Sequence, residues 1–213
     1  GARDLVQLAM VGTQPMVFAV PPRLGVKSAD ELVALAKATP MKLTFGSSGV
    51  STPLHLAGEM FNQMGHVQIN HVPYKGAAAM TSDLLGGSID VGVFVLSSVL
   101  PHVKSGKLIP LGVTESRRAA AAASIPTLGE SKSLAGFDMA IFFGVFAPAK
   151  IPEPLRTQLE REVLAVLGDT SVVQKLGDAG VTVHAAGGSV FGKKIADDIG
   201  KYRRIVDIAK IRE

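Results

Sequence analysis

Residue types that can hold a negatively charged group come together in the stretch TFGSSGVSTP. The apolar residues Leu43–Phe45 are typical of a short strand, and Gly46–Val50 after them are typical of a loop. Ser51 or Thr52 then caps a helix that begins at Pro53, because the first N–H groups of a helix lack partners within it. Such N–H groups and the helix dipole favour negative charge. The pattern predicts an anion-binding loop, although an ordinary strand-to-helix turn has the same pattern.

A second strand–loop–helix of the same kind follows in VPYKGAAAMTSDLLGG. Tyr74, Lys75 and Gly76 form its turn, and the pair Gly86-Gly87 ends its helix. Lys75 precedes the glycine that opens the helix, so its ammonium is placed to contact an anion. A solvated loop lysine is the alternative on sequence grounds.

The sequence contains no recognisable catalytic or metal-binding motif. A nucleophile elbow needs G-x-S-x-G, and in Gly46-Ser47-Ser48-Gly49-Val50 the second glycine comes one position too early. No acid is spaced to orient His55 as a base, and the glycines match neither dinucleotide nor P-loop patterns. The histidines show no H-x-x-x-H spacing; they are His55, His66, His71, His102 and His184. We expect no catalytic residue, no metal and no cofactor.

Composition favours a globular protein of one domain or two small ones. The 213 residues are 47% hydrophobic and 19% charged, with a net charge of +4 whose basic residues are scattered. Aromatic residues are only 5%, so no nucleic-acid surface is expected. The absence of cysteine excludes disulfides, no apolar run is long enough to span a bilayer, and the first residues do not form a signal peptide.

Predicted strands and helices alternate along most of the chain, which favours a mostly parallel sheet covered by helices. Strands are predicted at Leu5–Met10, Met16–Val20, Leu43–Phe45, Val67–Val72, Ile89–Leu96, Leu108–Val113, Phe137–Ala147 and Thr182–His184. Helices are predicted at Ser28–Ala38, from Pro53 to Gly65, before Gly86-Gly87, and at Ser97–Ser105, Glu153–Leu167, Ser171–Ala179 and Ser189–Ala209. The composition shift at residues 114–136 predicts a hinge, with the last helices in another lobe.

The ordered segments resemble a known family. They are TFGSSGVSTPLHLAGEMF, HVPYKGAAAMTSDLLGGSIDV, LPHVKSGKLIPLGVT, IPTLGE and FFGVFAPAKIPEPL. Together, from Asp4 to the C-terminus, they are similar to the periplasmic solute-binding proteins of tripartite tricarboxylate transporters, the Bug receptors. Two departures stand out: a tryptophan is usual where Phe142 stands, and a Gly-Thr-Ser type of loop is replaced by Val50–Pro53.

The resemblance implies an α/β fold of the two-lobed, Venus-flytrap type found in periplasmic binding proteins of type II. Family members usually begin with an extra strand–loop–helix section, and this chain begins after it, so the first lobe is expected to be incomplete. Residues 14–137 would then form the second lobe, and residues 1–13 with 138–213 would form what remains of the first.

The resemblance also implies a small carboxylate ligand in a cleft between the lobes, held by backbone amides, hydroxyls and waters. Carried over by position, the expected ligand-binding residues are Ser47, Ser48, Gly49, Ser51, Thr52, Lys75, Gly76, Ala77 and, as a wall, Phe142. The implied role is that of a periplasmic receptor without enzymatic activity. It would deliver a di- or tricarboxylate, acidic amino acid or similar acid to the transporter's membrane permease, as a monomer or, if truncated, a dimer.

A different class of protein remains open at this point. The effector-sensing domain of a LysR-type transcription regulator has a similar size and a two-lobed fold, and it also binds small anions. Such a domain would be cytoplasmic and would follow a helix-turn-helix and a linker helix, neither of which occurs in this sequence. An enzyme on the same scaffold would need an acid–base pair that the spacing does not supply.

Overall fold

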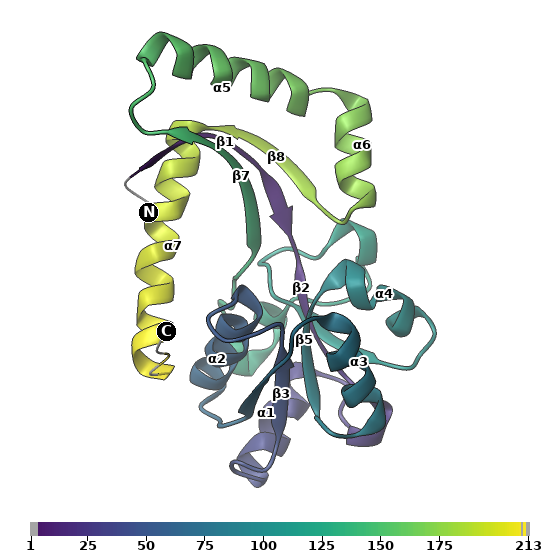
Figure 1. Ribbon diagram of the computed structural model, residues 1–213. Coiled ribbons are helices and arrows are strands. Elements are labelled where there is room, and N and C mark those ends of the chain that lie inside the picture. Colours follow the sequence, from purple (N-terminus) through teal and green to yellow (C-terminus); the bar gives the residue numbers. More distant parts are fainter. Residues whose placement is uncertain (1–3, 210, 212–213) are drawn as a thin grey trace. The chain divides into compact units, whose positions relative to one another are not determined.

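The computed structural model describes residues 4–209 and 211 (Figure 1). The chain divides into two compact units. One combines the chain up to Gln14 with Ile141–Arg203, and the other combines Pro15–Ala140 with the end of the chain from Arg204. The divisions after Gln14 and Ala140 lie within three residues of the boundaries expected from the sequence, whereas the residues from Arg204 group with the other unit.

The larger unit contains a five-stranded sheet with the order β4-β3-β5-β2-β6. Its strands are β2 (Met16–Val20), β3 (Thr44–Ser47), β4 (Asn70–Pro73), β5 (Val91–Val95) and β6 (Ile109–Val113). Strands β3, β4, β5 and β6 share one direction, and β2 runs opposite to both its neighbours. The expectation of a mostly parallel sheet is therefore right for four strands and wrong for β2. That strand enters the sheet directly from β1 of the other sheet, and it pairs antiparallel with β5 and β6, which lie far along the chain.

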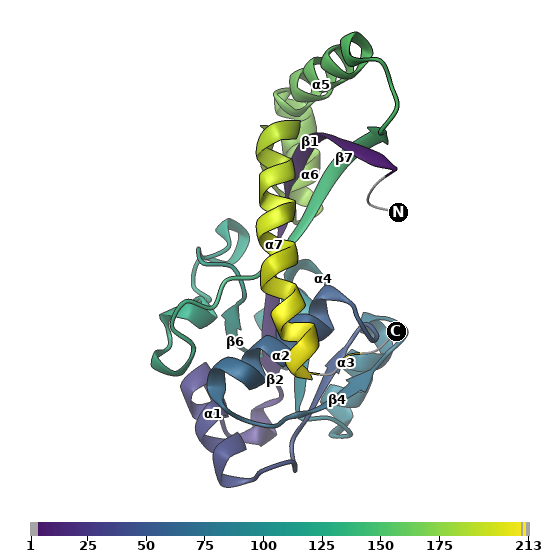
Figure 2. The same ribbon diagram turned by 90° about the vertical axis from the view of Figure 1, so that its left-hand side faces the viewer.

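Four helices belong to this unit: α1 (Ala29–Ala38), α2 (Pro53–Gly65), α3 (Ala77–Gly86) and α4 (Leu96–Lys104). Helices α2 and α3 pack against β3 and β5 (Figure 1). Strand β4, which is labelled in Figure 2, forms an edge of the sheet. Leu54, Ala57, Met60 and Phe61 of α2 are buried, and the rings of Phe61 and Phe18 stack with centroids 5.0 Å apart.

The smaller unit contains an antiparallel sheet with the order β7-β1-β8. Its strands are β1 (Leu5–Gln14), β7 (Ile141–Pro148) and β8 (Thr182–Gly187), and its helices are α5 (Glu153–Leu167), α6 (Thr170–Asp178) and α7 (Gly188–Ala209). The last residues of α7, from Arg204, group with the larger unit. The bounds of α5 are those predicted from its amphipathic pattern.

Two predicted strand ends are wrong, for local reasons. Strand β1 does not end at Met10, as predicted, but continues to Gln14: Gly12–Gln14 pair with β7, and a Cβ at Gly12 would lie 2.1 Å from the carbonyl oxygen of Thr182. The glycine here permits close approach of β8 rather than a turn. Strand β4 begins three residues later than predicted, because the Asn62 side chain bonds both the N–H and the carbonyl of Ile69, each at 3.0 Å.

The predicted hinge at residues 114–136 is also wrong. This segment lies within the larger unit, where Val113 bridges to Thr127 and the N–H of Met139 donates to the carbonyl of Thr114 at 2.7 Å. The chain passes between the units after Gln14, Ala140 and Arg203 instead.

Helix α2 packs closely on β3 at Gly58, where a Cβ would lie 2.1 Å from the buried ring of Phe45. We expect Gly58→Ala to lower the free energy of unfolding by about 1–3 kcal/mol, because overpacking outweighs the better helix propensity of alanine. Gly86→Ala, at the end of α3 with no atom within 4 Å of the new Cβ, is the matched control and should be close to neutral. Urea denaturation of the two variants measures this difference, and equal stability would contradict the packing described.

Candidate functional site

The carboxyl ends of β3, β4 and β5 lie on the same side of the larger sheet, because these strands run in one direction. The loop after β3 leads into α2, the turn after β4 leads into α3, and α4 follows β5 directly. The first two connections are neighbours: Tyr74 N–H donates to the carbonyl of Ser47 at 2.9 Å, and a Cβ at Gly49 would lie 4.0 Å from the carbonyl oxygen of Tyr74. The sheet thus brings together the two turns that the sequence singled out. In α/β sheets, ligands bind outside the carboxyl ends of the strands.

Several predicted donors are unpartnered. Among the described residues, no acceptor takes the N–H of Ser48, Gly76 or Ala77. Gly76 stands at the N-cap of α3 with φ 153°, so no side chain caps this helix, and its first turn has no acidic residue. These are the features of a helix N-terminus that accepts an anion.

Two other predicted donors are already used inside the fold. Gly49 N–H donates to Ser47 Oγ at 3.3 Å, and Ser51 N–H donates to His55 Nδ1 at 3.1 Å. The loop therefore offers fewer free amides than its sequence suggests, because neighbouring side chains accept some of its N–H groups.

Thr52 closes the loop with one hydroxyl. Its Oγ accepts from His55 N–H at 3.3 Å, as a cap of α2, and donates to the carbonyl of Gly49 at 2.8 Å. Of the two caps that the sequence allowed, the structure uses Thr52. The same hydroxyl thus starts the helix and ties back the loop before it.

Lys75 is exposed on the turn after β4, and no carboxylate among the described residues pairs with it. The turn is fixed beside it by Tyr74, whose OH donates to Asp83 Oδ2 at 2.8 Å. Burial, helped by the hydrogen bond with Asp83, raises the pKa of Tyr74 to about 12, so this donor stays protonated. Lys75 is therefore an exposed cation at the start of α3.

Phe142 lies on β7 in the smaller unit, whereas the other eight predicted residues lie in the larger one. Its ring packs edge-on against Phe191, with centroids 5.6 Å apart, and Lys194 Nζ lies 5.6 Å from the centre of the ring. Its role as a wall of the ligand site stays a prediction.

Sequence reasoning missed two histidines that support the loop. The rings of His55 and His71 stack with centroids 3.7 Å apart and planes 13° from parallel. His71 Nε2 lies 2.7 Å from Ser47 Oγ, and His55 Nε2 lies 3.7 Å from Glu59 Oε1. The expectation that no acid is spaced to orient His55 is therefore wrong: Glu59 lies one helical turn further on, and this spacing was the signal available in the sequence.

A serine beside a histidine can form a nucleophile–base pair. Ser47, however, is 0% exposed, and its hydroxyl also contacts the carbonyl of Gly49 at 3.1 Å. The pair lies beneath the loop, where it organises backbone groups. Burial, followed by the nearby His55, lowers the pKa of His71 to about 4, so this ring is neutral near pH 7.

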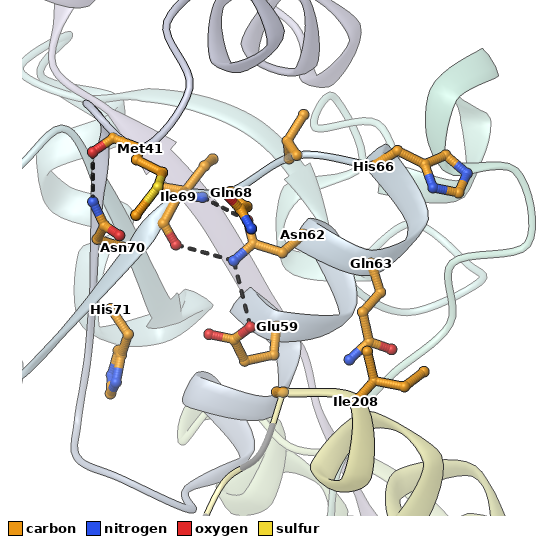
Figure 3. A pocket seen from close by; sticks show the side chains of 12 residues that line it. Met41, Glu59, Asn62, Gln63, His66, Gln68, Ile69, Asn70, His71 and Ile208 are labelled. Carbon is orange, nitrogen blue, oxygen red and sulfur yellow. Dashed lines mark hydrogen bonds between the residues drawn. The ribbon is translucent and has the colours of Figure 1, made fainter.

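A cavity of about 610 Å³ lies within the larger unit, with His71 among the residues that line it (Figure 3). Side chains of α2 and the segment through β4 line it, together with Ile208 and Ala209 of α7. Glu59 and His71 face it, but none of the nine predicted site residues does. Within the described ranges, no group of three His, Asp or Glu side chains is arranged to hold a metal ion.

The chain matches known proteins over nearly its full length. Residues 1–211 match the model of the tripartite tricarboxylate transporter family receptor. BugT of Bordetella pertussis is 31% identical over 203 residues, which are 95% of this chain and 62% of BugT. A UPF0065 protein of Pseudomonas sp. strain P51 is 28% identical over 96% of this chain and 61% of its own length. The chain thus spans about three-fifths of the length of these curated relatives.

Solved structures agree with this likeness. R. palustris Rpa4515, determined with adipate, superposes with a TM-score of 0.84 at 29% identity, covering 99% of this chain and 70% of that one. The periplasmic binding protein BugD superposes with a TM-score of 0.80 at 24% identity, over 98% of this chain and 70% of that one.

The predicted fold is thereby confirmed as that of the periplasmic binding proteins, of which this chain spans a part. None of the helices within residues 4–209 is long and apolar enough to cross a membrane. The match over residues 1–211 and the identity with BugT lead to one conclusion: the chain belongs to the receptor family of the tripartite tricarboxylate transporters.

Proposed function

We propose that this chain is the carboxylate-binding part of a periplasmic solute receptor, and that it hands its ligand to the permease of a tripartite tricarboxylate transporter. One observation carries the proposal: the free N–H groups of Ser48, Gly76 and Ala77 lie on neighbouring turns at the carboxyl ends of β3 and β4, where α/β sheets commonly bind ligands. Lys75 adds a positive charge there. The family match favours this role over the LysR-type effector domain.

Oxyanions suit this set of donors because each carboxylate oxygen accepts more than one hydrogen bond. The relative determined with adipate suggests a dicarboxylate, whose second carboxylate would meet donors outside these two turns. The proposed chemistry is capture without covalent change, since the one serine–histidine pair beneath the loop is buried.

Energetics decide how tightly this chain alone should bind. Hydrogen bonds to a charged group contribute about 1.5–3 kcal/mol each, so three N–H groups supply roughly 5–9 kcal/mol before the costs of association. Micromolar binding needs about 8 kcal/mol after those costs. We therefore expect this chain to bind organic acids weakly, in the millimolar to high micromolar range.

Calorimetric titration with adipate, succinate and citrate tests the proposal, with adipamide as the uncharged control. At least one of these acids should bind, and binding should weaken with added salt because part of it is electrostatic. Absence of binding by all the acids, or equal binding of adipamide, would contradict the proposal.

Ala77→Pro removes one proposed donor and little else. Proline is well tolerated at the first helical position, so the helix start should survive the loss of this N–H. We expect the dissociation constant for the best acid to rise about 10-fold, equivalent to about 1.4 kcal/mol. Thr170→Pro removes the corresponding N–H at the start of α6 in the smaller unit and is the matched control. An unchanged dissociation constant in Ala77→Pro would show that the N–H of Ala77 does not contact the ligand.

Thr52→Val tests whether the Thr52 hydroxyl serves only as a helix cap or also supports ligand binding. Loss of the hydroxyl should lower the free energy of unfolding by about 1–2 kcal/mol and weaken acid binding several-fold, because the loop loses its tie to the carbonyl of Gly49. Ser28→Ala removes the cap of α1 and should lower stability to a similar extent without changing affinity. If Thr52→Val lowers only stability, the hydroxyl is a cap and not part of the binding loop.

A further inference from the structure

The loop after β3 is held from beneath by two histidines on different elements. His55 on α2 accepts the N–H of Ser51 at 3.1 Å, and His71 on β4 lies 2.7 Å from the hydroxyl of Ser47. That hydroxyl in turn accepts the N–H of Gly49 at 3.3 Å. The histidines thus act on both ends of the loop segment from Gly49 to Ser51.

The hydrogen bond from Ser51 defines the state of the His55 ring. A backbone N–H can only donate, so Nδ1 of His55 must carry a lone pair and no proton. The proton of the neutral ring then lies on Nε2, which faces Glu59 Oε1 at 3.7 Å. A second proton would occupy Nδ1 and remove the acceptor that Ser51 uses.

The stacked geometry adds a second constraint. With ring centroids 3.7 Å apart and His55 only 6% exposed, charges on both rings would repel strongly. At least one ring must therefore be neutral for the stack to persist.

We propose that His55 and His71 are positioning residues for the ligand-binding loop, and that His55 holds it in its binding conformation only while its Nδ1 carries no proton. This inference rests on the proposed function, because it assigns the regulation of the same site. Acid would release the N–H of Ser51 and loosen the loop, so the receptor would give up its ligand more readily at low pH.

The surroundings of the pair contain few other ionisable groups. Glu59 on α2 is the charged side chain that faces the rings among the described residues, and β3 contributes Phe45 and Ser47, which do not titrate. Among the described residues, the adjoining cavity is also lined by His66 at the end of α2 and by Ile208 and Ala209 of α7. A pH response of the loop can therefore be traced to the two histidines and Glu59.

Paired variants of His55 test the role of the acceptor. Asparagine places an oxygen near the position of Nδ1 and does not titrate, whereas leucine has a similar shape and no acceptor. We expect His55→Leu to speed hydrogen exchange of the Ser51 amide at least 10-fold and to weaken adipate binding about 5- to 10-fold. His55→Asn should restore both values, and His66→Asn at the far end of α2 should change neither.

The pH dependence of hydrogen-exchange protection at Ser51 gives a second test, because a purely structural role of His55 would not produce it. In the wild type, protection of the Ser51 amide should be lost in step with the change in the His55 ring signals, both followed by NMR as the pH is lowered from 7.5 to 4.5. In His55→Asn the protection should not depend on pH in this range. The proposal would be overturned if His55→Leu left the exchange rate of the Ser51 amide unchanged. It would also be overturned if the loss of protection at Ser51 did not follow the change in the His55 ring signals. These measurements need no ligand, so they also decide the matter if no acid binds.

Stability should respond to the same pair. A proton binds His71 in the unfolded chain near pH 6.5 but in the folded protein only near pH 4, so stability is complete above pH 6.5 and declines as pH falls toward 4. By pH 5 the unfolding equilibrium constant should rise about 10- to 30-fold relative to pH 7.5. His71→Gln, which keeps a polar group near Nε2, should lose most of this dependence. Denaturation at both pH values measures it, and an equal decline in the variant would contradict the assignment to His71.

Discussion

The parallel pairing of β3 with β4 is the constraint on which the candidate site depends. Its last pair joins Ser47 to Pro73, and the next N–H, that of Tyr74, still bonds to the carbonyl of Ser47. Because the two strands end together, the turns that lead from them into α2 and α3 are neighbours. Backbone pairing thus brings together the two turns that carry the unpartnered N–H groups of Ser48, Gly76 and Ala77.

The loop after β3 combines unfavourable backbone conformations with a dense set of hydrogen bonds. Gly49 has φ 134° and Ser51 has φ 61°, a left-handed conformation that costs a non-glycine residue about 1–2 kcal/mol. The hydrogen bond from Ser51 N–H to His55 and the one from the Thr52 hydroxyl to the carbonyl of Gly49 offset this strain. A loop held in this way is preorganised, which lowers the cost of ordering it when a ligand binds.

Local patterns in the sequence predicted most of the elements but not the interactions between them. Proline and hydroxyl signals gave the start of α2, and amphipathic spacing gave α5 residue for residue. The direction of β2 and the length of β1 depend on partners far along the chain, which no local pattern reports. The predicted hinge followed composition, whereas the units divide where backbone pairing changes partners.

The site shows the same limit. Its two turns were found because each carries its own glycine and cap signals. Ser51 N–H was expected to be free, but it bonds to His55, and Ser47 meets His71 only because β3 and β4 pair in one particular register. The sequence spacing of 24 residues between Ser47 and His71 carries no hint of that contact.

The most direct test of the account follows individual amides while a carboxylate is added. In ¹H–¹⁵N spectra, adipate should shift the signals of Ser48, Gly76 and Ala77, and adipamide at the same concentration should leave them unmoved. If adipate binds but shifts only amides elsewhere in the chain, the free N–H groups at the carboxyl ends of β3 and β4 do not hold the ligand.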